Sequence, residues 1–148
     1  MQRHRVTQIS LVGDAFARPL NEALDASEAA GLLHDLTSVT RIVSTGATLS
    51  ADQKRAFQRR LPNAVIVDMI GASEGGPYAM SMTMPGSEPP ETAVFTAPPN
   101  VVTIDPLTDQ VLPRGSDVPG MLGATGAMPR GYWGDDAKTA QTFRTIDG

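Results

Sequence analysis

One hydroxyl and one carboxylate stand side by side in a glycine-rich stretch near the middle of the chain. Ser73 and Glu74 follow the apolar segment 64–70 and are enclosed by Gly71 on one side and Gly75 on the other. A serine hydroxyl can donate to a phosphate oxygen, and carboxylate oxygens are ligands that Mg²⁺ prefers. Glycine lets the backbone turn sharply and approach a ligand closely. These residue types indicate a phosphate and magnesium site, and the alternative is an ordinary exposed loop with one solvated glutamate.

The segment before this pair predicts a buried strand. Val65, Ile66 and Val67 are β-branched, and such residues suit a pleated environment that is apolar on both sides. Two earlier stretches have the same character, at residues 8–13 and 39–44. In open α/β sheets, ligands bind at the carboxyl ends of the strands, where Ser73 and Glu74 would lie.

Helices are predicted between these strands. Asp14 is a candidate N-cap for a first helix with apolar residues at helical spacing, and a second short helical piece is expected over 32–35. Ser50 and Gln53 have the spacing of a capping box, which predicts a helix from there to about Leu61. The resulting β-α-β-α-β order has connections long enough for right-handed crossovers, so the three strands should be parallel.

Parallel strands would bring their following loops to one edge of the sheet. The loop after the second strand contains Gly46 and Ala47, and the third strand leads into the stretch from Gly71 to Gly76. Small residues in adjacent loops leave room for a flat or phosphorylated ligand, although tight turns without a ligand use the same residues.

The second half of the chain is predicted to consist of short strands and turns. Met80, Met82 and Met84 alternate with small residues, which is strand spacing, and we expect them to face a core. Further strands are expected over 101–105, 110–112 and 118–123, and Asp135 or Asp136 should cap a short helix. Packing roles are expected for the aromatic pair Tyr132 and Trp133.

Composition limits the functional classes. The 148 residues suit one soluble globular domain, and a net charge of −4 gives no reason to bind nucleic acid or an anionic membrane. The absence of cysteine excludes a disulfide framework and a thiol nucleophile. No apolar run is long enough for a signal peptide or membrane span, so a cytoplasmic location is expected.

Three elements of the chain together resemble the adenylate-forming enzymes. Thr45-Gly46-Ala47, Gly71-Ala72-Ser73-Glu74-Gly75-Gly76 and Gly131-Tyr132-Trp133 occur in the order and spacing of acyl-CoA synthetases. The segment 12–20 is similar to actinobacterial fatty-acid–CoA ligases. The resemblance implies a ligase that activates a fatty or related carboxylic acid with ATP to an acyl-adenylate and then transfers the acyl group to coenzyme A.

The resemblance also implies roles for individual residues. Ser73 would hydrogen-bond the α-phosphate and Glu74 would bind Mg²⁺, so these two are the candidate catalytic residues. The other candidate nucleotide-binding residues are Gly46, Ala47, Ile70, Gly71 and Ala72. Ile70 stands where the family usually has an aromatic residue that packs on adenine.

The same resemblance implies an internal piece of a larger enzyme. Residues 1–76 would belong to one α/β subdomain, a partial parallel βαβαβ unit, and residues 77–148 to the short strands of a barrel-like subdomain. The phosphate loop, the ribose-binding aspartate and the catalytic lysine of the family are not found in this chain. We therefore expect the isolated chain to be inactive. The alternatives are a residual AMP-binding module or a non-catalytic fragment that self-associates through surface left exposed.

Overall fold

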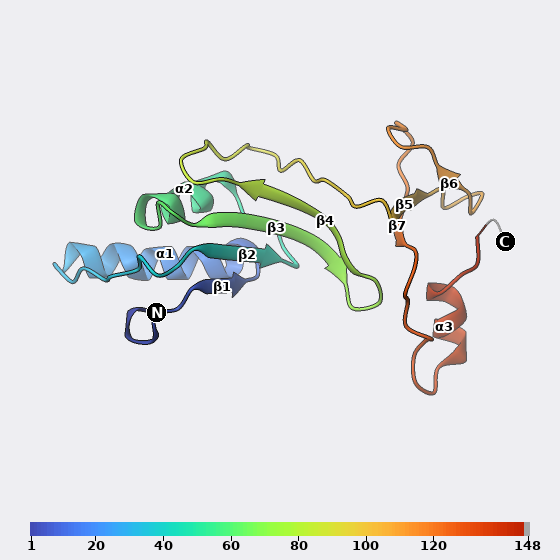
Figure 1. Cartoon of the computed structure of the whole chain (residues 1–148), viewed down its shortest axis with the longest axis horizontal. Helices are drawn as coiled ribbons and strands as arrows, with labels where there is room; N and C mark the ends of the chain where they lie inside the picture. Colours follow the sequence, from blue (N-terminus) through green and yellow to red (C-terminus); the bar gives the residue numbers. More distant parts are fainter. Residues whose placement is uncertain (147–148) are drawn as a thin grey trace. The chain divides into compact units, whose positions relative to one another are not determined.

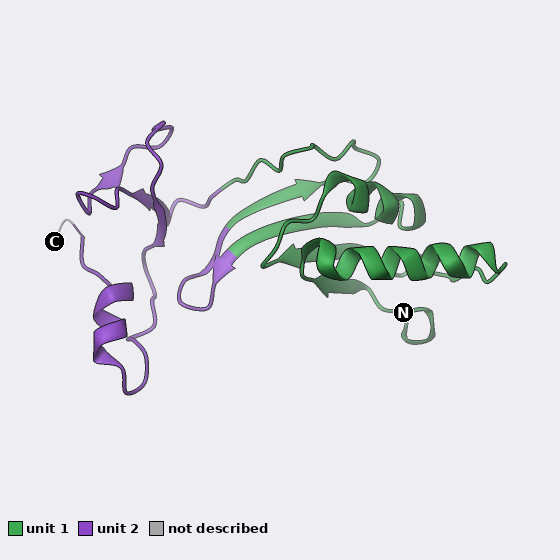
Figure 2. Cartoon of the chain, turned by 180° about the vertical axis from the view of Figure 1, so that it is seen from behind, with its two compact units in different colours: residues 1–70, 79–96 green, residues 71–78, 97–148 purple. Residues whose placement is uncertain are grey.

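The computed structural model describes residues 1–146, and these divide into two compact units (Figure 2). Unit 1 comprises residues 1–70 and 79–96, and unit 2 comprises residues 71–78 and 97–148. The sequence-based division after residue 76 concerns the parts of a longer enzyme and stays a prediction. None of the described helices is long and apolar enough to cross a lipid bilayer.

Unit 1 is built around a sheet with two helices on one face. Strand order is β1-β2-β3-β4, and β2 pairs in parallel with both β1 and β3. Figures 1 and 2, seen from opposite sides, place both helices on the same face of the sheet. The elements are η1 (Gln2–His4), β1 (Gln8–Leu11), α1 (Gly13–Ala29), β2 (Arg41–Thr45), α2 (Ala51–Arg60), β3 (Val65–Ala72) and β4 (Gly76–Thr83). The predicted parallel β-α-β-α-β order is confirmed.

The core of unit 1 lies between the sheet and the two helices. Ile42 of β2, Ile66 of β3 and Phe57 of α2 are almost completely buried, and they belong to one cluster of buried apolar residues. Alternate residues of each strand point to opposite faces, so this cluster accounts for one face of the sheet only.

The beginning of α1 differs from the prediction. The helix begins at Gly13, so Asp14 lies inside the first turn and is not the N-cap. Its Oδ1 accepts a hydrogen bond of 2.8 Å from the backbone N–H of Ser50, which leads into α2. The helical piece expected over 32–35 is absent from the described structure, where this segment has no regular secondary structure.

The predicted capping box of α2 is half formed. The Ser50 hydroxyl accepts from the backbone N–H of Gln53 at 3.4 Å. The second arm is missing because the Gln53 side chain is used elsewhere: its Oε1 accepts from Asn21 Nδ2 of α1 at 2.9 Å. A residue that would close a local cap therefore connects the two helices instead.

The methionines of β4 and of the position directly after it do not face a core, so this prediction is wrong. Met80, Met82 and Met84 are 45%, 64% and 53% exposed. The opposite face of the strand, including Ser81 and Thr83, is buried. Small side chains face the helix-covered side of the sheet, which leaves the long thioether side chains on the side that the helices of unit 1 do not cover.

Unit 2 contains a small antiparallel sheet and one short helix. Strand order is β6-β5-β7, and the strands are β5 (Val101–Ile104), β6 (Val111–Leu112) and β7 (Met121–Ala124). Helix α3 (Asp136–Thr142) is capped by Asp135, whose Oδ1 accepts from the backbone N–H of Lys138 at 2.9 Å. Parallel α/β structure followed by short β strands is the predicted fold class, and it is confirmed.

Candidate functional site

The loops after β1 and β2 are bonded to each other in unit 1. The backbone N–H of Gly13 donates to Ser44 Oγ at 3.1 Å, and that of Asp14 donates to the Thr48 carbonyl at 2.9 Å. Gly13 has φ +49°, and a Cβ atom at this position would lie 2.4 Å from the Thr48 oxygen. Only glycine permits this conformation and this close approach together.

Three of the predicted site residues lie at this end of the unit 1 sheet. Thr45 pairs with Met69 in the parallel register, so Gly46, the first residue after β2, comes at the level of Ile70, which is still within β3. Gly46 has φ +79°, and it is exposed together with Ala47. Ile70 is 38% exposed.

The other four predicted residues belong to unit 2, where they form the end of β3 and the turn into β4. Gly71 lies so close to the returning chain that a Cβ atom there would be 2.7 Å from the Gly76 carbonyl oxygen. Ala72 is partly buried, Ser73 is exposed, and Glu74 is partly buried. The tight turn thus presents the hydroxyl of Ser73 and the carboxylate of Glu74 next to each other in the chain.

Tyr132 contacts this turn, which the sequence analysis did not predict. Its hydroxyl donates a hydrogen bond to Oε1 of Glu74. This bond lowers the pKa of the Glu74 carboxyl below its ordinary value, and the nearby charge of Lys138 lowers it further. The same bond raises the pKa of the Tyr132 hydroxyl. Glu74 is therefore an ionised carboxylate at neutral pH.

The ring of Tyr132 is held from several sides. The Lys138 ammonium lies 4.1 Å from the ring centroid, and the Phe143 ring is 5.9 Å away with an interplanar angle of 57°. The backbone N–H of Tyr132 donates to Thr139 Oγ1 at 2.9 Å. Packing was predicted for both aromatic residues of this motif, but the prediction is wrong for Trp133, which is fully exposed.

The described residues offer a single carboxylate for a metal ion at this turn. Among residues 1–146, no three His, Asp or Glu side chains form a group that could hold a metal ion. This donor set fits Mg²⁺ held mainly by ligand phosphates and waters, which needs only one or two protein carboxylates. It does not fit a cation that requires a complete protein cage.

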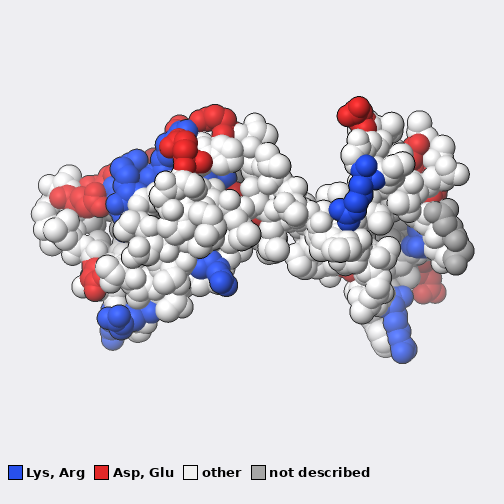
Figure 3. Space-filling model, turned by 45° about the horizontal axis from the view of Figure 1, so that its top comes forward, with Lys and Arg blue, Asp and Glu red and all other residues white. Residues whose placement is uncertain are grey.

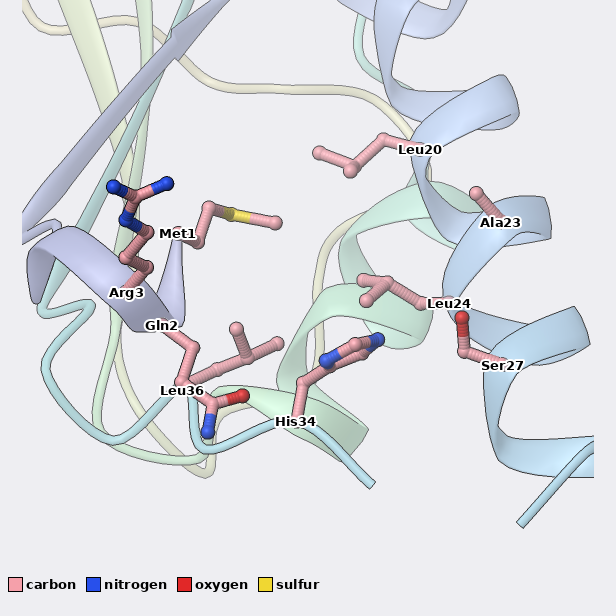
Figure 4. A pocket seen from close by; sticks show the side chains of 9 residues that line it. All are labelled: Met1, Gln2, Arg3, Leu20, Ala23, Leu24, Ser27, His34 and Leu36. Atoms are coloured by element: carbon pink, nitrogen blue, oxygen red, sulfur yellow. The ribbon is translucent and has the colours of Figure 1, made fainter. Parts of the chain in front are cut away.

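A hollow of about 500 Å³ lies elsewhere in unit 1, between η1 and α1 (Figure 4). Its lining is mostly apolar and includes Leu20, Leu24 and Leu36, with His34 at one side. None of the predicted site residues lines this hollow.

Several charged residues on the helices of unit 1 form ion pairs. Figure 3 shows positive and negative side chains interleaved over one side of this unit. Arg55 contacts Glu88 and Glu91, each at 2.6 Å. Both hydrogen bonds raise the pKa of the Arg55 guanidinium, and the bond to Glu91 has the larger effect. One pair is buried: Lys54 Nζ of α2 lies 2.6 Å from Asp68 Oδ2 of β3, and the Lys54 side chain is 1% exposed. These ion pairs hold α2 to its surroundings.

Comparisons with known proteins agree on one group of enzymes. The model of a family described as AMP-binding enzyme matches residues 1–133. A medium/long-chain-fatty-acid–CoA/3-oxocholest-4-en-26-oate–CoA ligase from Mycolicibacterium smegmatis is 40% identical over 145 residues, which is 98% of this chain and 26% of the relative. The medium-chain acyl-CoA ligase Mig from Mycobacterium avium is 38% identical over 148 residues, 100% of this chain and 26% of the relative. The chain thus spans about a quarter of the length of these curated relatives.

Solved structures support the fold. VinN matches with a TM-score of 0.74 at 22% identity, over 97% of this chain and 35% of that one. The anthranilate CoA ligase AuaEII in complex with anthranoyl-AMP matches with a TM-score of 0.67 at 23% identity, over 98% of this chain and 26% of that one.

Proposed function

This chain belongs to the family of AMP-binding enzymes, and from that membership we propose that it contributes to a ligase that activates a carboxylic acid. The proposed reaction of the longer enzyme begins when the acid and ATP form an acyl-adenylate and pyrophosphate. The thiol of coenzyme A then displaces AMP and takes the acyl group. The names of the curated relatives support a fatty or related acid as the substrate. The observation that carries the proposal is the ionised Glu74 carboxylate beside the Ser73 hydroxyl on the turn after β3.

The residues of this turn would act on the phosphates of the nucleotide. Ser73 would donate its hydroxyl to the α-phosphate, and Glu74 would hold Mg²⁺. When bound, Mg²⁺ would offset the negative charge that develops as pyrophosphate leaves. Gly71 and Ala72 would form the backbone beneath the nucleotide, where the absence of large side chains allows close approach.

The residues in unit 1 would contact the organic part of the ligands. Gly46 and Ala47 would line the adenine or acyl pocket, because both are exposed and small. Ile70 would cover the base with an aliphatic surface. Such a contact excludes water but lacks the offset stacking that an aromatic ring would supply.

We propose that the isolated chain does not catalyse the reaction. In this proposal, other segments of the longer enzyme supply the groups that bind the β- and γ-phosphates. They also supply the lysine that acts in the first step. Incubation of the chain with ATP, Mg²⁺ and a fatty acid should yield no acyl-AMP above the level without protein. Formation of acyl-AMP by this chain would contradict the proposal.

The role of Glu74 is tested by nucleotide binding. We expect ATP with Mg²⁺ to raise the melting temperature of the chain more than ATP with EDTA does. Glu74→Gln should remove the difference between these two conditions and leave the smaller effect of ATP in EDTA unchanged. Glu22→Gln, a matched change on α1, should behave as the wild type. If Glu74→Gln keeps the full Mg²⁺ effect, the proposed metal role is wrong.

A second candidate function is supported by the apolar sheet face. Met80 and Met82 of β4 and Met84 directly after it are exposed, and contiguous apolar surface favours association. The chain would then be a non-catalytic fragment that pairs with a second copy through this face. If no adenine nucleotide binds to the chain, a self-associating fragment is favoured over a residual AMP-binding module.

A further inference from the structure

We propose that Tyr132 is a positioning residue that holds the Glu74 carboxylate by one oxygen and leaves the other free for Mg²⁺. The inference rests on the proposed metal role of Glu74 and deepens it. Its basis is the hydrogen bond from the Tyr132 hydroxyl to Oε1 of Glu74. The two residues are 58 positions apart, and both belong to unit 2.

A hydroxyl donor suits this purpose better than a cation would. A lysine or arginine bonded directly to Glu74 would neutralise the carboxylate and compete with Mg²⁺, whereas Lys138 acts on it only as a nearby charge. Tyr132 instead donates a single neutral hydrogen bond, which keeps the negative charge of the carboxylate in place. A carboxylate ligand that is itself hydrogen-bonded is oriented before the metal arrives.

The ring is held in place before any ligand binds. Lys138 lies over its face with the ammonium 4.1 Å from the ring centroid, and its charge also helps to lower the pKa of Glu74. Phe143 packs against it at a tilted angle of 57°, and the hydrogen bond to Thr139 anchors its backbone. Each contact reduces the freedom of the hydroxyl, which is what positioning requires.

The close approach of Thr139 to the chain before Tyr132 depends on Gly131. Its φ is +145°, and a Cβ atom at this position would lie 2.4 Å from Thr139 Cγ2. A larger residue would push Thr139 away, and the backbone bond that anchors Tyr132 would be lost. The glycine, tyrosine and helix α3 therefore act as one support for Glu74.

The test observes Glu74 directly by NMR of its side-chain carboxyl carbon in the ¹³C-labelled chain. Glu74→Gln identifies the resonance, because this variant lacks it. In Tyr132→Phe, the pKa of Glu74 should rise toward its ordinary value. Titration with MgCl₂ in the presence of ATP should give an affinity about tenfold lower than in the wild type, as expected for loss of a partner of a metal ligand.

Tyr78→Phe is the matched control, since it removes the only other tyrosine hydroxyl of the chain, which lies close to Gly75 of the same turn but has no hydrogen bond to Glu74 among the described residues. It should leave both the pKa of Glu74 and the Mg²⁺ affinity unchanged. An unchanged pKa of Glu74 in Tyr132→Phe would overturn the contact. A shifted pKa with wild-type Mg²⁺ affinity would overturn the positioning role alone. If the wild-type Glu74 resonance does not respond to MgCl₂ and ATP, the proposed metal role of Glu74 fails, and the inference fails with it.

Discussion

Lys54 and Asp68 form a buried ion pair in unit 1, and each side chain needs the other as its partner. Lys54 and Asp68 both lie in the region between α2 and the sheet, and their side chains are 1% and 9% exposed. In this position each charge depends on the other, because water cannot replace a lost partner. An ion pair of the same residue types on the surface would contribute little to the free energy of unfolding.

We expect Lys54→Met to lower the free energy of unfolding by about 3–5 kcal/mol, since it leaves the Asp68 carboxylate buried without a partner. Urea denaturation followed by circular dichroism measures this. The double variant with Asp68→Leu serves as the control and should be within about 1 kcal/mol of the wild type, because both charges are removed together. A double variant as unstable as the single one would show that the Lys54 contacts matter only through packing.

The bond between Glu74 and Tyr132 makes stability depend on pH at both ends of the scale. Folding lowers the pKa of Glu74, so the contribution of the bond is complete above the ordinary value of 4.5 and is lost as the pH falls below it. Folding raises the pKa of Tyr132, so the contribution is complete below the ordinary value of 10.0 and is lost as the pH rises beyond it.

The difference in melting temperature between wild type and Tyr132→Phe should therefore be largest between these two values and shrink outside them. The pKa of Asp35 is also lowered, by its hydrogen bonds to Thr37, but this group is the same in both proteins and cancels in the difference. If this difference in melting temperature changes by no more than the measurement error between pH 3 and pH 11, the contact is contradicted.

At the scale of elements, Gly13 joins β1 to α1 and lets this loop meet the loop after β2. Two separate demands meet at this glycine: a positive φ and a close contact with the Thr48 carbonyl. Gly31, which follows α1, has φ +76°, but a Cβ atom added there would have nothing within 4 Å. Substitution of Gly31 therefore tests the effect of the positive φ on stability alone, whereas substitution of Gly13 tests the positive φ and the steric clash together.

We expect Gly31→Ala to destabilise the chain by about 1–2 kcal/mol, the cost of a left-handed conformation for alanine. Gly13→Ala should cost about 1–3 kcal/mol more, because the added methyl group forces the backbone at Thr48 to move. Chemical denaturation of both variants measures this. Equal effects at the two positions would mean that the loops separate freely, and the bonded arrangement of the two loops would then be wrong.

Sequence periodicity predicted the strands, the crossovers and their direction, because apolar alternation and helix signals are local properties. It could not predict which face of β4 is covered, since alternation distinguishes two faces without saying which one a helix occupies. Asp14 was misassigned because its partner, the Ser50 backbone, comes from the neighbouring loop. Glu74 was found as a candidate, but Tyr132 was not connected to it, because no spacing rule relates residues in different segments.

At the scale of the whole molecule, the side of the unit 1 sheet opposite the helices carries apolar residues at the surface. Parallel sheets are usually covered on both faces. Val43, Val67 and Met69 are only partly buried there, and the methionines of β4 are exposed. A second copy of the chain would remove this surface from water.

We expect the chain to self-associate, with an average mass that rises with concentration in analytical ultracentrifugation. Met82→Glu places a charge in the middle of this face and should shift the protein toward the monomer. Leu33→Glu changes a residue of unit 1 that is 82% exposed and lies outside the sheet, so it should associate as the wild type does. If the wild-type protein is monomeric at all concentrations, self-association is contradicted. If both variants have equal effects, the role of the sheet face with the exposed methionines is contradicted.

The separation in sequence between contacting residues also bears on the order in which the chain folds. The free energy needed to close a loop in an unfolded chain increases with the logarithm of its length. The first crossover of unit 1 brings Thr40 to Thr7 over 33 positions, and helix α1 occupies much of the loop. Glu74 and Tyr132 must meet over 58 positions, which contain strands β4 to β7 and no described helix. We therefore expect the sheet of unit 1 to form first, and the candidate metal ligand to receive its support late in folding.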